Sequence, residues 1–286
     1  MTGVSFSSLL RCPICHSALR ESADDLRCEK DGNHAFPRAG QYIVFTEANP
    51  GKYDADYAER YAFLWSYGYE TRHSGLVESL YRSVGSLAAE ALAEMREASP
   101  AVIDCGCGTG RAIADASLLV PSAQFLGVDL SPAKLTLASR ILLGSEPVVS
   151  VLPQLGFETP QTIRGRGLKN VTLARADALS LPVKDGSADL TFCVNLLDRV
   201  DDPERAVREL RRTLRRGGGL ILTTPLNWGR ADLWTKFPDG NNLVEMIRQC
   251  GFEIRTWFDQ LIYREALDRR GSVEEFTTLV ISARAA

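Results

Sequence analysis

The sequence predicts an α/β protein with an open, mainly parallel sheet and a small additional unit at its N-terminal end. Apolar runs typical of buried strands alternate with helical stretches between residues 100 and 225. A turn with glycine at 106, 108 and 110 follows the first of these runs. The third observation is a pair of cysteines, Cys12 and Cys15, in a short segment rich in turn residues.

The glycine turn comes directly after apolar residues 101–103 and the acidic Asp104. Glycine lets the main chain approach a ligand closely, and open α/β sheets bind ligands at the carboxyl ends of their strands. The dinucleotide fingerprint G-x-G-x-x-G would need glycine where Arg111 stands, and a Walker loop would need a Gly-Lys-Ser/Thr ending. The pattern D-x-G-x-G-x-G instead resembles the first motif of class I S-adenosylmethionine (SAM) methyltransferases.

Acidic residues also end the next two predicted strands. Asp129 lies about 20 residues past the glycines, where a carboxylate can accept hydrogen bonds from ribose hydroxyls. An acid at this position would also fit an NAD-binding enzyme. The resemblance assigns Asp177 and the backbone amide of Ala178 to the adenine edge. Together with strands expected near 188–195 and 215–222, these cues predict a Rossmann-like class I methyltransferase sheet. The resemblance implies that SAM is bound by Asp104, Gly106, Gly108, Gly110, Asp129, Leu130, Asp177, Ala178 and Asn195.

The composition is that of an ordinary soluble globular protein, with 45% hydrophobic and 24% charged residues among 286. No apolar run approaches the roughly 20 residues that cross a bilayer, and the N-terminus lacks the basic region and apolar core of a signal peptide. We therefore expect a cytoplasmic protein with no membrane partner. The net charge of -3 argues against gripping long nucleic acids by charge alone. The sequence leaves the oligomeric state open.

The N-terminal cysteines predict a structural zinc site. Zinc prefers four tetrahedral ligands from cysteine and histidine, often beginning with a C-x2-C pair. Cys12 and Cys15 form that pair, Cys28 has the spacing of a ribbon, and we favour His34 as the fourth ligand. Asp31 and His16 are alternative fourth ligands. The alternative to a zinc site is a ribbon that is held by its own small core and binds no metal.

The same segment resembles the N-terminal zinc unit of the guanine-modifying ribosomal RNA methyltransferases. There too a C-x2-C pair, a later cysteine and a histidine precede a Gly-x-x-x-hydrophobic stretch, here residues 40–45. The interval from Cys28 to His34 is longer than in that family. Residues 1–50 also hold five Lys/Arg against six Asp/Glu, whereas a sequence-independent RNA clamp should be basic.

The chain divides into three predicted regions: a zinc-ribbon-like unit over 1–48, a helical lid or linker over 49–99, and a SAM-binding domain over 100–286. Aromatic residues crowd the second region, and they either pack on the core or form a lid in which a tyrosine or Arg72 faces the methionine end of SAM. An insertion over 144–168 is longer than a usual connection and rich in valine and leucine, so we expect it to pack as a cover on the substrate side.

The substrate side rests on a further resemblance. The stretches at 195–200, 222–228 and 261–265 look like the methyltransferase domain of ovothiol biosynthesis, which methylates a ring nitrogen of a thiohistidine. The resemblance implies a small polar substrate and makes candidates of Tyr263, Arg264 and Glu265, although an exposed edge strand would also explain them. Any general base could be Asp198, His73, Tyr263 or Glu265, and the sequence does not choose among them.

The sequence therefore predicts a SAM-dependent methyltransferase acting on a small molecule, with a heteroatom of an amino-acid-derived metabolite as a candidate acceptor. One alternative is a ribosomal RNA base methyltransferase, to which the arginines of the predicted helix 203–216 would contribute, although a solvated helix flank also explains them. The other is a non-catalytic SAM-binding protein whose zinc ribbon docks a partner.

Overall fold

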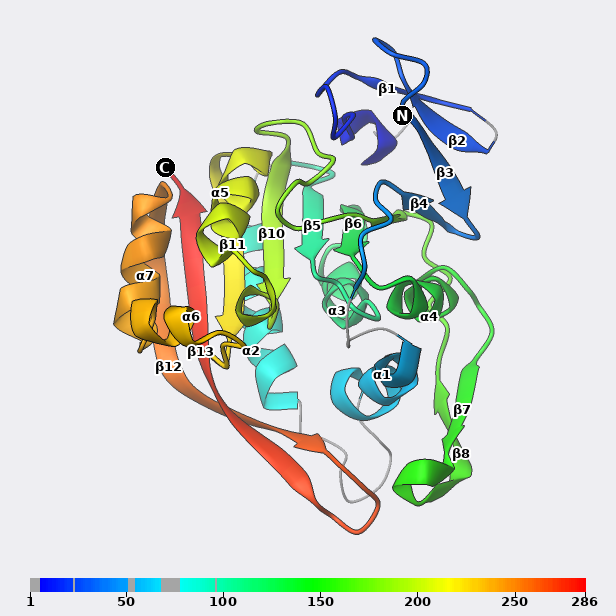
Figure 1. The fold of residues 1–286 in the computed structure, drawn as a ribbon, viewed down its shortest axis with the longest axis vertical. Coiled ribbons are helices and arrows are strands. Elements are labelled where there is room, and N and C mark those ends of the chain that lie inside the picture. Colours follow the sequence, from blue (N-terminus) through cyan, green and yellow to red (C-terminus); the bar gives the residue numbers. More distant parts are fainter. Residues whose placement is uncertain (1–5, 23, 51–54, 68–77, 96) are drawn as a thin grey trace.

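A mixed sheet runs through the whole molecule (Figure 1). The computed structural model describes residues 6–22, 24–50, 55–67, 78–95 and 97–286. These residues form an eleven-stranded sheet in the order β1-β2-β3-β4-β9-β6-β5-β10-β11-β13-β12 and a separate two-stranded sheet, β7-β8. The strands are β1 (Leu19–Glu21), β2 (Asp25–Cys28), β3 (Ala35–Ala39), β4 (Tyr42–Val44), β5 (Ala101–Cys105), β6 (Gln124–Asp129), β7 (Val148–Leu152), β8 (Phe157–Ile163), β9 (Val171–Arg175), β10 (Ala188–Val194), β11 (Leu214–Thr224), β12 (Phe252–Ala266) and β13 (Val273–Ala285).

Helices cover both faces of the central strands, which confirms the predicted α/β architecture. Helices α2, α3 and α4 pack on one face, and α5, α6 and α7 pack on the other. Because both faces are covered, β5 and β10 are buried along their whole length, and this explains their continuous apolar sequence. The helices are α1 (Ala55–Arg60), η3 (Tyr61–Ser66, a π-helix), α2 (Glu78–Ala93), α3 (Arg111–Leu119), α4 (Pro132–Leu142), α5 (Pro203–Thr213), α6 (Ala231–Lys236) and α7 (Gly240–Gln249), with short 3-10 turns η1 (Phe6–Leu9), η4 (Pro153–Leu155) and η5 (Leu197–Arg199).

The strand directions bring the predicted site to one edge of the sheet. Strands β4, β9, β6, β5, β10 and β11 are parallel, and β13 pairs antiparallel with both β11 and β12. In this register Asp104 lies beside Gly127, and Asp129 lies beside Arg175. Asp104, next to the end of β5, and Asp129, at the end of β6, therefore lie at the same edge of the sheet.

The N-terminal strands continue the sheet of the core. β4 pairs parallel with β9, and β3 pairs antiparallel with β4. Leu10 also forms an isolated bridge to Val183, in the loop that follows β9. No gap in the sheet marks the boundary drawn at residue 48, because backbone pairing continues from β1 to β12.

Three additional elements surround the carboxyl edge of the sheet: α1 with η3, the β7–β8 hairpin, and a long arm formed by β12 and β13, which extends past the rest of the sheet (Figure 1). Phe63 and Leu64 of η3 share a small core with Leu152 and Phe157 of the hairpin. None of the residues of 144–168 lines the cleft described below, so the expected cover on the substrate side stays a prediction. Alternate residues of β7 are buried, so the insertion supports η3 from behind.

In the part of the chain that the structure describes, every helix is too short or too polar to cross a membrane.

Candidate active site

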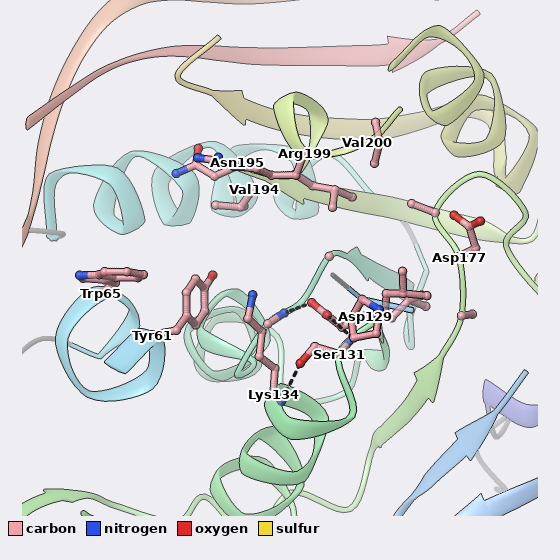
Figure 2. A pocket seen from close by; sticks show the side chains of 18 of the residues that line it. Tyr61, Trp65, Asp129, Ser131, Lys134, Asp177, Val194, Asn195, Arg199 and Val200 are labelled. Carbon is pink, nitrogen blue, oxygen red and sulfur yellow. Dashed lines mark hydrogen bonds between the residues drawn. The ribbon is translucent and has the colours of Figure 1, made fainter. Parts of the chain in front are cut away.

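A deep cleft opens at the carboxyl ends of β5, β6, β9 and β10 (Figure 2), with a volume of about 1320 Å³ including its open mouth. Asp177 and Val200 lie toward one end of the cleft, Trp65 and Tyr61 lie toward the other, and Asp129 lies between them. Of the nine residues predicted to bind SAM, seven line this cleft: Gly106, Gly108, Asp129, Leu130, Asp177, Ala178 and Asn195.

The glycine turn needs glycine for both conformation and space. Gly106, Gly108 and Gly110 have φ of +77°, +54° and +84°, a region that side chains disfavour. A Cβ on Gly108 would lie 2.6 Å from Cε1 of Tyr61, so the aromatic ring packs directly on the turn. Gly110 lies behind the cleft and begins α3, where a Cβ would meet Leu142.

Asp129 fixes the turn at the centre of the cleft. Its Oδ2 accepts a hydrogen bond from the Gly108 amide at 2.8 Å, and its Oδ1 accepts one from the Ser131 amide at 2.9 Å. Each carboxylate oxygen has a second lone pair. The side chain can therefore hold the turn and still accept hydrogen bonds from a diol.

Asp104 lies beneath the turn and outside the lining of the cleft. It is 2% exposed, and its Oδ2 has no hydrogen-bond partner among the described residues. Burial, and then the charge of Asp129, raise the pKa of Asp104 to about 8. A buried carboxyl with an unused oxygen is suited to a cationic ligand that would favour its ionised form.

The end of the cleft with Asp177 is held by the N-terminal segment. The Leu179 amide donates to Asp177 Oδ1 at 2.8 Å, and Pro50 lines the wall nearby. The Arg175 guanidinium donates to Glu47 at 2.6 Å, to the Ala48 carbonyl at 3.0 Å and to the Leu130 carbonyl at 3.2 Å. Arg175 therefore ties the segment after β4 to the turn after β6.

The opposite end of the cleft is lined by side chains from elements far apart in the sequence. Sequence reasoning missed five residues that line the cleft: Leu80, Tyr81, Ser131, Lys134 and Arg199, of which Ser131 lies beside Asp129 (Figure 2). Lys134 could have been found from the sequence. Ser131 and Pro132 mark the start of a helix at the carboxyl end of β6, and Lys134 is the third residue of that helix. Its ammonium lies 4.5 Å from the ring centroid of Tyr61 (Figure 2).

Tyr263 is held at this end by Asn195. The Asn195 Nδ2 donates to the Tyr263 hydroxyl at 2.9 Å, and Asn195 Oδ1 accepts from the Thr223 hydroxyl at 2.8 Å. Asn195 adopts φ of +51°, which asparagine tolerates better than most residues. Each end of its amide makes one of these bonds, and Nδ2 keeps a second N–H while Oδ1 keeps a second lone pair for a ligand. β12 is an edge strand, but Tyr263 itself is 3% exposed, so the alternative of an exposed strand surface does not hold at this residue.

The candidate general bases differ in whether they line the cleft. Glu265 lines the cleft, and burial and its cross-strand neighbour Glu274 raise its pKa to about 7. Asp198 is buried behind the lining, where it pairs with Arg199 at 3.3 Å. Arg264 points outward to Glu275 at 2.7 Å. His73 and Arg72 lie outside the described residues.

Arg111, which stands at the third fingerprint glycine, joins η3 and α2 to α3. It donates to Asp115 at 2.7 Å, to the Ser66 carbonyl at 2.7 Å and to Glu78 at 3.0 Å. Its guanidinium also lies 4.8 Å from the ring centroid of Tyr81. Burial opposes its charge, but these two acids raise the pKa of Arg111 overall.

A second cluster lies in the N-terminal unit. The donor atoms of Cys12, Cys15, Cys28 and His34 all lie within 4.8 Å of one another. His34 Nδ1 is 3.5 Å from Cys12 Sγ, while its Nε2 faces Asp31 at 3.6 Å. Asp31 therefore lies behind the histidine, outside the group of four. His16 occupies the turn of the knuckle with φ of +61°, and its amide donates to the Cys12 carbonyl at 2.9 Å.

The arginines of α5 are engaged within the chain. Arg208 pairs with Glu204, Arg212 pairs with Glu209 and Asp185, and Arg211 donates to the Gly251 carbonyl. These contacts explain the arginines without RNA.

Comparison with known proteins identifies the central region. A family model described as a methyltransferase domain matches residues 103–222. A 2-methyl-6-phytyl-1,4-hydroquinone methyltransferase from Oryza sativa subsp. japonica is 28% identical over 111 residues, which cover 37% of this chain and 32% of that protein. A malonyl-[acyl-carrier protein] O-methyltransferase from Hahella chejuensis is 33% identical over 132 residues, which cover 46% of this chain and 39% of that protein.

These alignments span less than half the length of either curated relative. Among solved structures, magnesium protoporphyrin IX methyltransferase from Synechocystis PCC 6803 with bound SAM aligns over 82% of this chain and 93% of its own. Its TM-score is 0.54 at 15% identity, a likeness of fold.

Proposed function

Because residues 103–222 form a class I SAM-dependent methyltransferase domain, we propose that this chain transfers the methyl group of SAM to a heteroatom of a small molecule. The observation that carries the proposal is the convergence of Asp104, Asp129 and Asp177 around one glycine turn at the carboxyl edge of the sheet.

Each part of SAM has a complementary group in the cleft or directly beneath its glycine turn. Asp129 is suited to the ribose diol, and Asp177 with the Ala178 amide is suited to the adenine edge. Asp104 has an unused buried oxygen for the cationic methionine part. Gly106 and Gly108 give the main chain the close approach that this ligand needs.

The protein then has to orient the acceptor and receive its proton. The sulfonium of SAM supplies an activated methyl group, so no protein nucleophile is required. Proximity and alignment supply much of the rate acceleration, and the rigid strand ends provide both. Glu265 is the side chain of the cleft best suited to accept a proton, because its pKa of about 7 lies near neutral pH.

A small acceptor fits the enclosed end of the cleft, where Tyr61, Trp65 and Tyr81 form the walls. The two curated methyltransferases compared above carry a hydroquinone and a malonyl-[acyl-carrier protein] in their names. A heteroatom of an amino-acid-derived metabolite remains our candidate acceptor within this class, and the cytoplasm our expected location.

We further propose that Cys12, Cys15, Cys28 and His34 hold one structural zinc ion. Three thiols and an imidazole nitrogen in one group are the donor set that zinc prefers. Asp31 would orient the imidazole from its other nitrogen, as carboxylates beside metal-bound histidines commonly do.

Two measurements test the function. Calorimetric titration should detect SAM binding to the purified chain, and SAM with a labelled methyl group should deliver label to the small-molecule fraction of a lysate. The absence of binding would refute the assignment of the cleft. Label in RNA would favour a base methyltransferase, and binding without transfer to any fraction would favour a non-catalytic SAM-binding protein.

A further inference from the structure

The direction of the hydrogen bonds around Asn195 determines what Tyr263 can do. The Thr223 hydroxyl donates to Asn195 Oδ1 at 2.8 Å, while the Asn195 main-chain N–H donates to the Thr223 main-chain carbonyl at 2.9 Å and also reaches the Thr223 hydroxyl at 3.2 Å. This fixes the orientation of the amide, and Asn195 Nδ2 donates to the Tyr263 oxygen at 2.9 Å. The phenol is therefore the acceptor in its contact with Asn195.

The proton of Tyr263 is consequently available to a ligand. Tyr263 lines the cleft, and the contact with Asn195 is the only hydrogen bond of its hydroxyl among the described residues. Burial raises the pKa of Tyr263 well above its ordinary value, so the phenol keeps its proton. At this end of the cleft Tyr263 is a fixed hydrogen-bond donor.

Glu265 supplies the complementary group on the same face of the strand. Residues two apart on a strand point to the same side, with their Cα atoms about 7 Å apart. Within the described chain, no hydrogen bond or ion pair engages the Glu265 carboxylate. The charged groups that act on it are Glu274 of β13, which opposes its ionisation, and Arg199 of η5, Arg60 of α1 and Lys134 of α4, which favour it.

Aromatic side chains form the rest of this end. Tyr61 and Trp65 meet edge to face with ring centroids 6.3 Å apart, and Tyr81 lines the cleft beside them. Flat aromatic walls favour a planar ligand, which can stack on them or meet their edges.

We propose that the methyl acceptor is a planar ring carrying a protic heteroatom next to an oxygen atom, with Tyr263 donating to the oxygen and Glu265 receiving the proton. This inference rests on the proposed function and narrows its substrate class. Asn195 is a positioning residue, because it acts through the Tyr263 hydroxyl. The reaction breaks the bond between the methyl carbon and the sulfonium sulfur, and that electron pair stays on sulfur. The acceptor heteroatom forms the new bond to carbon and transfers its proton to Glu265.

Catechol and phenol are matched probes, because they differ only in the neighbouring oxygen. With the full chain and labelled SAM, kcat/KM should be about fivefold or more higher for catechol than for phenol, the factor that one net hydrogen bond provides. Tyr263→Phe should reduce this ratio to less than about twofold, mainly through KM for catechol. Thr223→Val, which releases the Asn195 amide, should give an intermediate ratio, and Thr223→Ser should retain it.

Glu265→Gln should lower kcat for both probes and remove the rise of kcat/KM with pH through about 7. A ratio near one in the unmodified chain, or one that Tyr263→Phe leaves unchanged, would overturn the proposal. SAM binding without methylation of either probe would overturn the acceptor class alone. Failure to bind SAM would instead refute the proposed function, so titration with SAM accompanies every variant.

Discussion

The two ends of the cleft are built in different ways. The end that we assign to adenosine is made by neighbouring parallel strands, with Asp129 and Asp177 at strand ends and backbone amides around them. The acceptor end is made by side chains from η3, α4, η5 and β12, which are separated by up to 200 residues of chain. The first end is therefore set by local geometry, and the second by long-range packing.

This difference should appear as two kinds of functional loss. A change at the adenosine end removes a charged side chain that also holds the main chain, so SAM affinity should fall steeply. A change at the acceptor end removes one of several contacts from separate elements. There the discrimination between acceptors should fall while SAM affinity is retained.

The largest effect should follow Asp129→Ala. The substitution leaves the amides of Gly108 and Ser131 without partners and removes the carboxylate assigned to the ribose. Hydrogen bonds to a charged group contribute about 1.5–3 kcal/mol each, so the Kd for SAM should rise more than about 100-fold. Calorimetric titration measures this change. Asp232→Ala, which removes an exposed acid paired with Arg230, should leave the Kd unchanged, and an equal loss in both variants would contradict the assignment.

The second effect is a pH dependence of SAM binding that originates at Asp104. Its pKa of about 8 means that the carboxyl is protonated at pH 6, and a cationic ligand should favour the ionised form. Affinity should therefore rise roughly tenfold per pH unit at most between pH 6 and about 8, with release of a proton. Titrations in buffers of different ionisation enthalpy detect that proton.

Asp104→Asn is the control for this effect, and it should abolish the slope. The raised pKa also means that the folded protein binds more protons than the unfolded chain between about pH 4 and 8. Unfolding free energy should fall as pH rises through this window, and less steeply in the variant. A slope that persists in Asp104→Asn would assign the titration to another group.

The adenosine end was largely predictable from sequence because its signals are contiguous. Asp104, Asp129 and Asp177 each end an apolar run, and parallel strands bring such ends to one edge. The cysteine spacing likewise indicated the N-terminal cluster, although only the fold shows that His34 and not Asp31 is its fourth member.

The acceptor end was predictable only in part, because its contacts are made by elements that are distant in the sequence and meet only in the folded protein. From the sequence, Tyr263 could equally have been exposed on an edge strand, and only the folded structure shows its contact with Asn195. Along β7 the buried residues Val148, Ser150 and Leu152 alternate with the exposed Val149 and Val151, and the valine-rich sequence carries no matching apolar-polar alternation that would predict this strand. Arg199 and Tyr81 had no local signal, since a single arginine or tyrosine on a helix or turn is usually structural.

Metal removal tests whether the adenosine end depends only on its own strands or also on the N-terminal unit. β4 continues the sheet beside β9, and Arg175 joins Glu47 and Ala48 to Leu130. Elemental analysis should find one zinc ion per chain. A strong chelator, or Cys15→Ser, should lower the Tm and raise the Kd for SAM about five- to tenfold through loss of order in this segment. Cys250→Ser, at a thiol far from the cluster, should keep the metal, and zinc loss with unchanged SAM affinity would show the two sites to be independent.

The smallest effect should come from Trp65→Phe, which tests the acceptor end alone. Trp65 Nε1 donates to the Ala266 carbonyl at 3.0 Å, so the indole joins η3 to the arm that carries Tyr263 and Glu265. Phenylalanine keeps an aromatic wall and loses this hydrogen bond, which contributes about 1 kcal/mol. With catechol as acceptor, KM should rise about fivefold while the Kd for SAM changes less than about twofold. If SAM affinity fell as much as acceptor KM rose, η3 would serve both ends, and the division of the cleft into a local and a long-range half would be wrong.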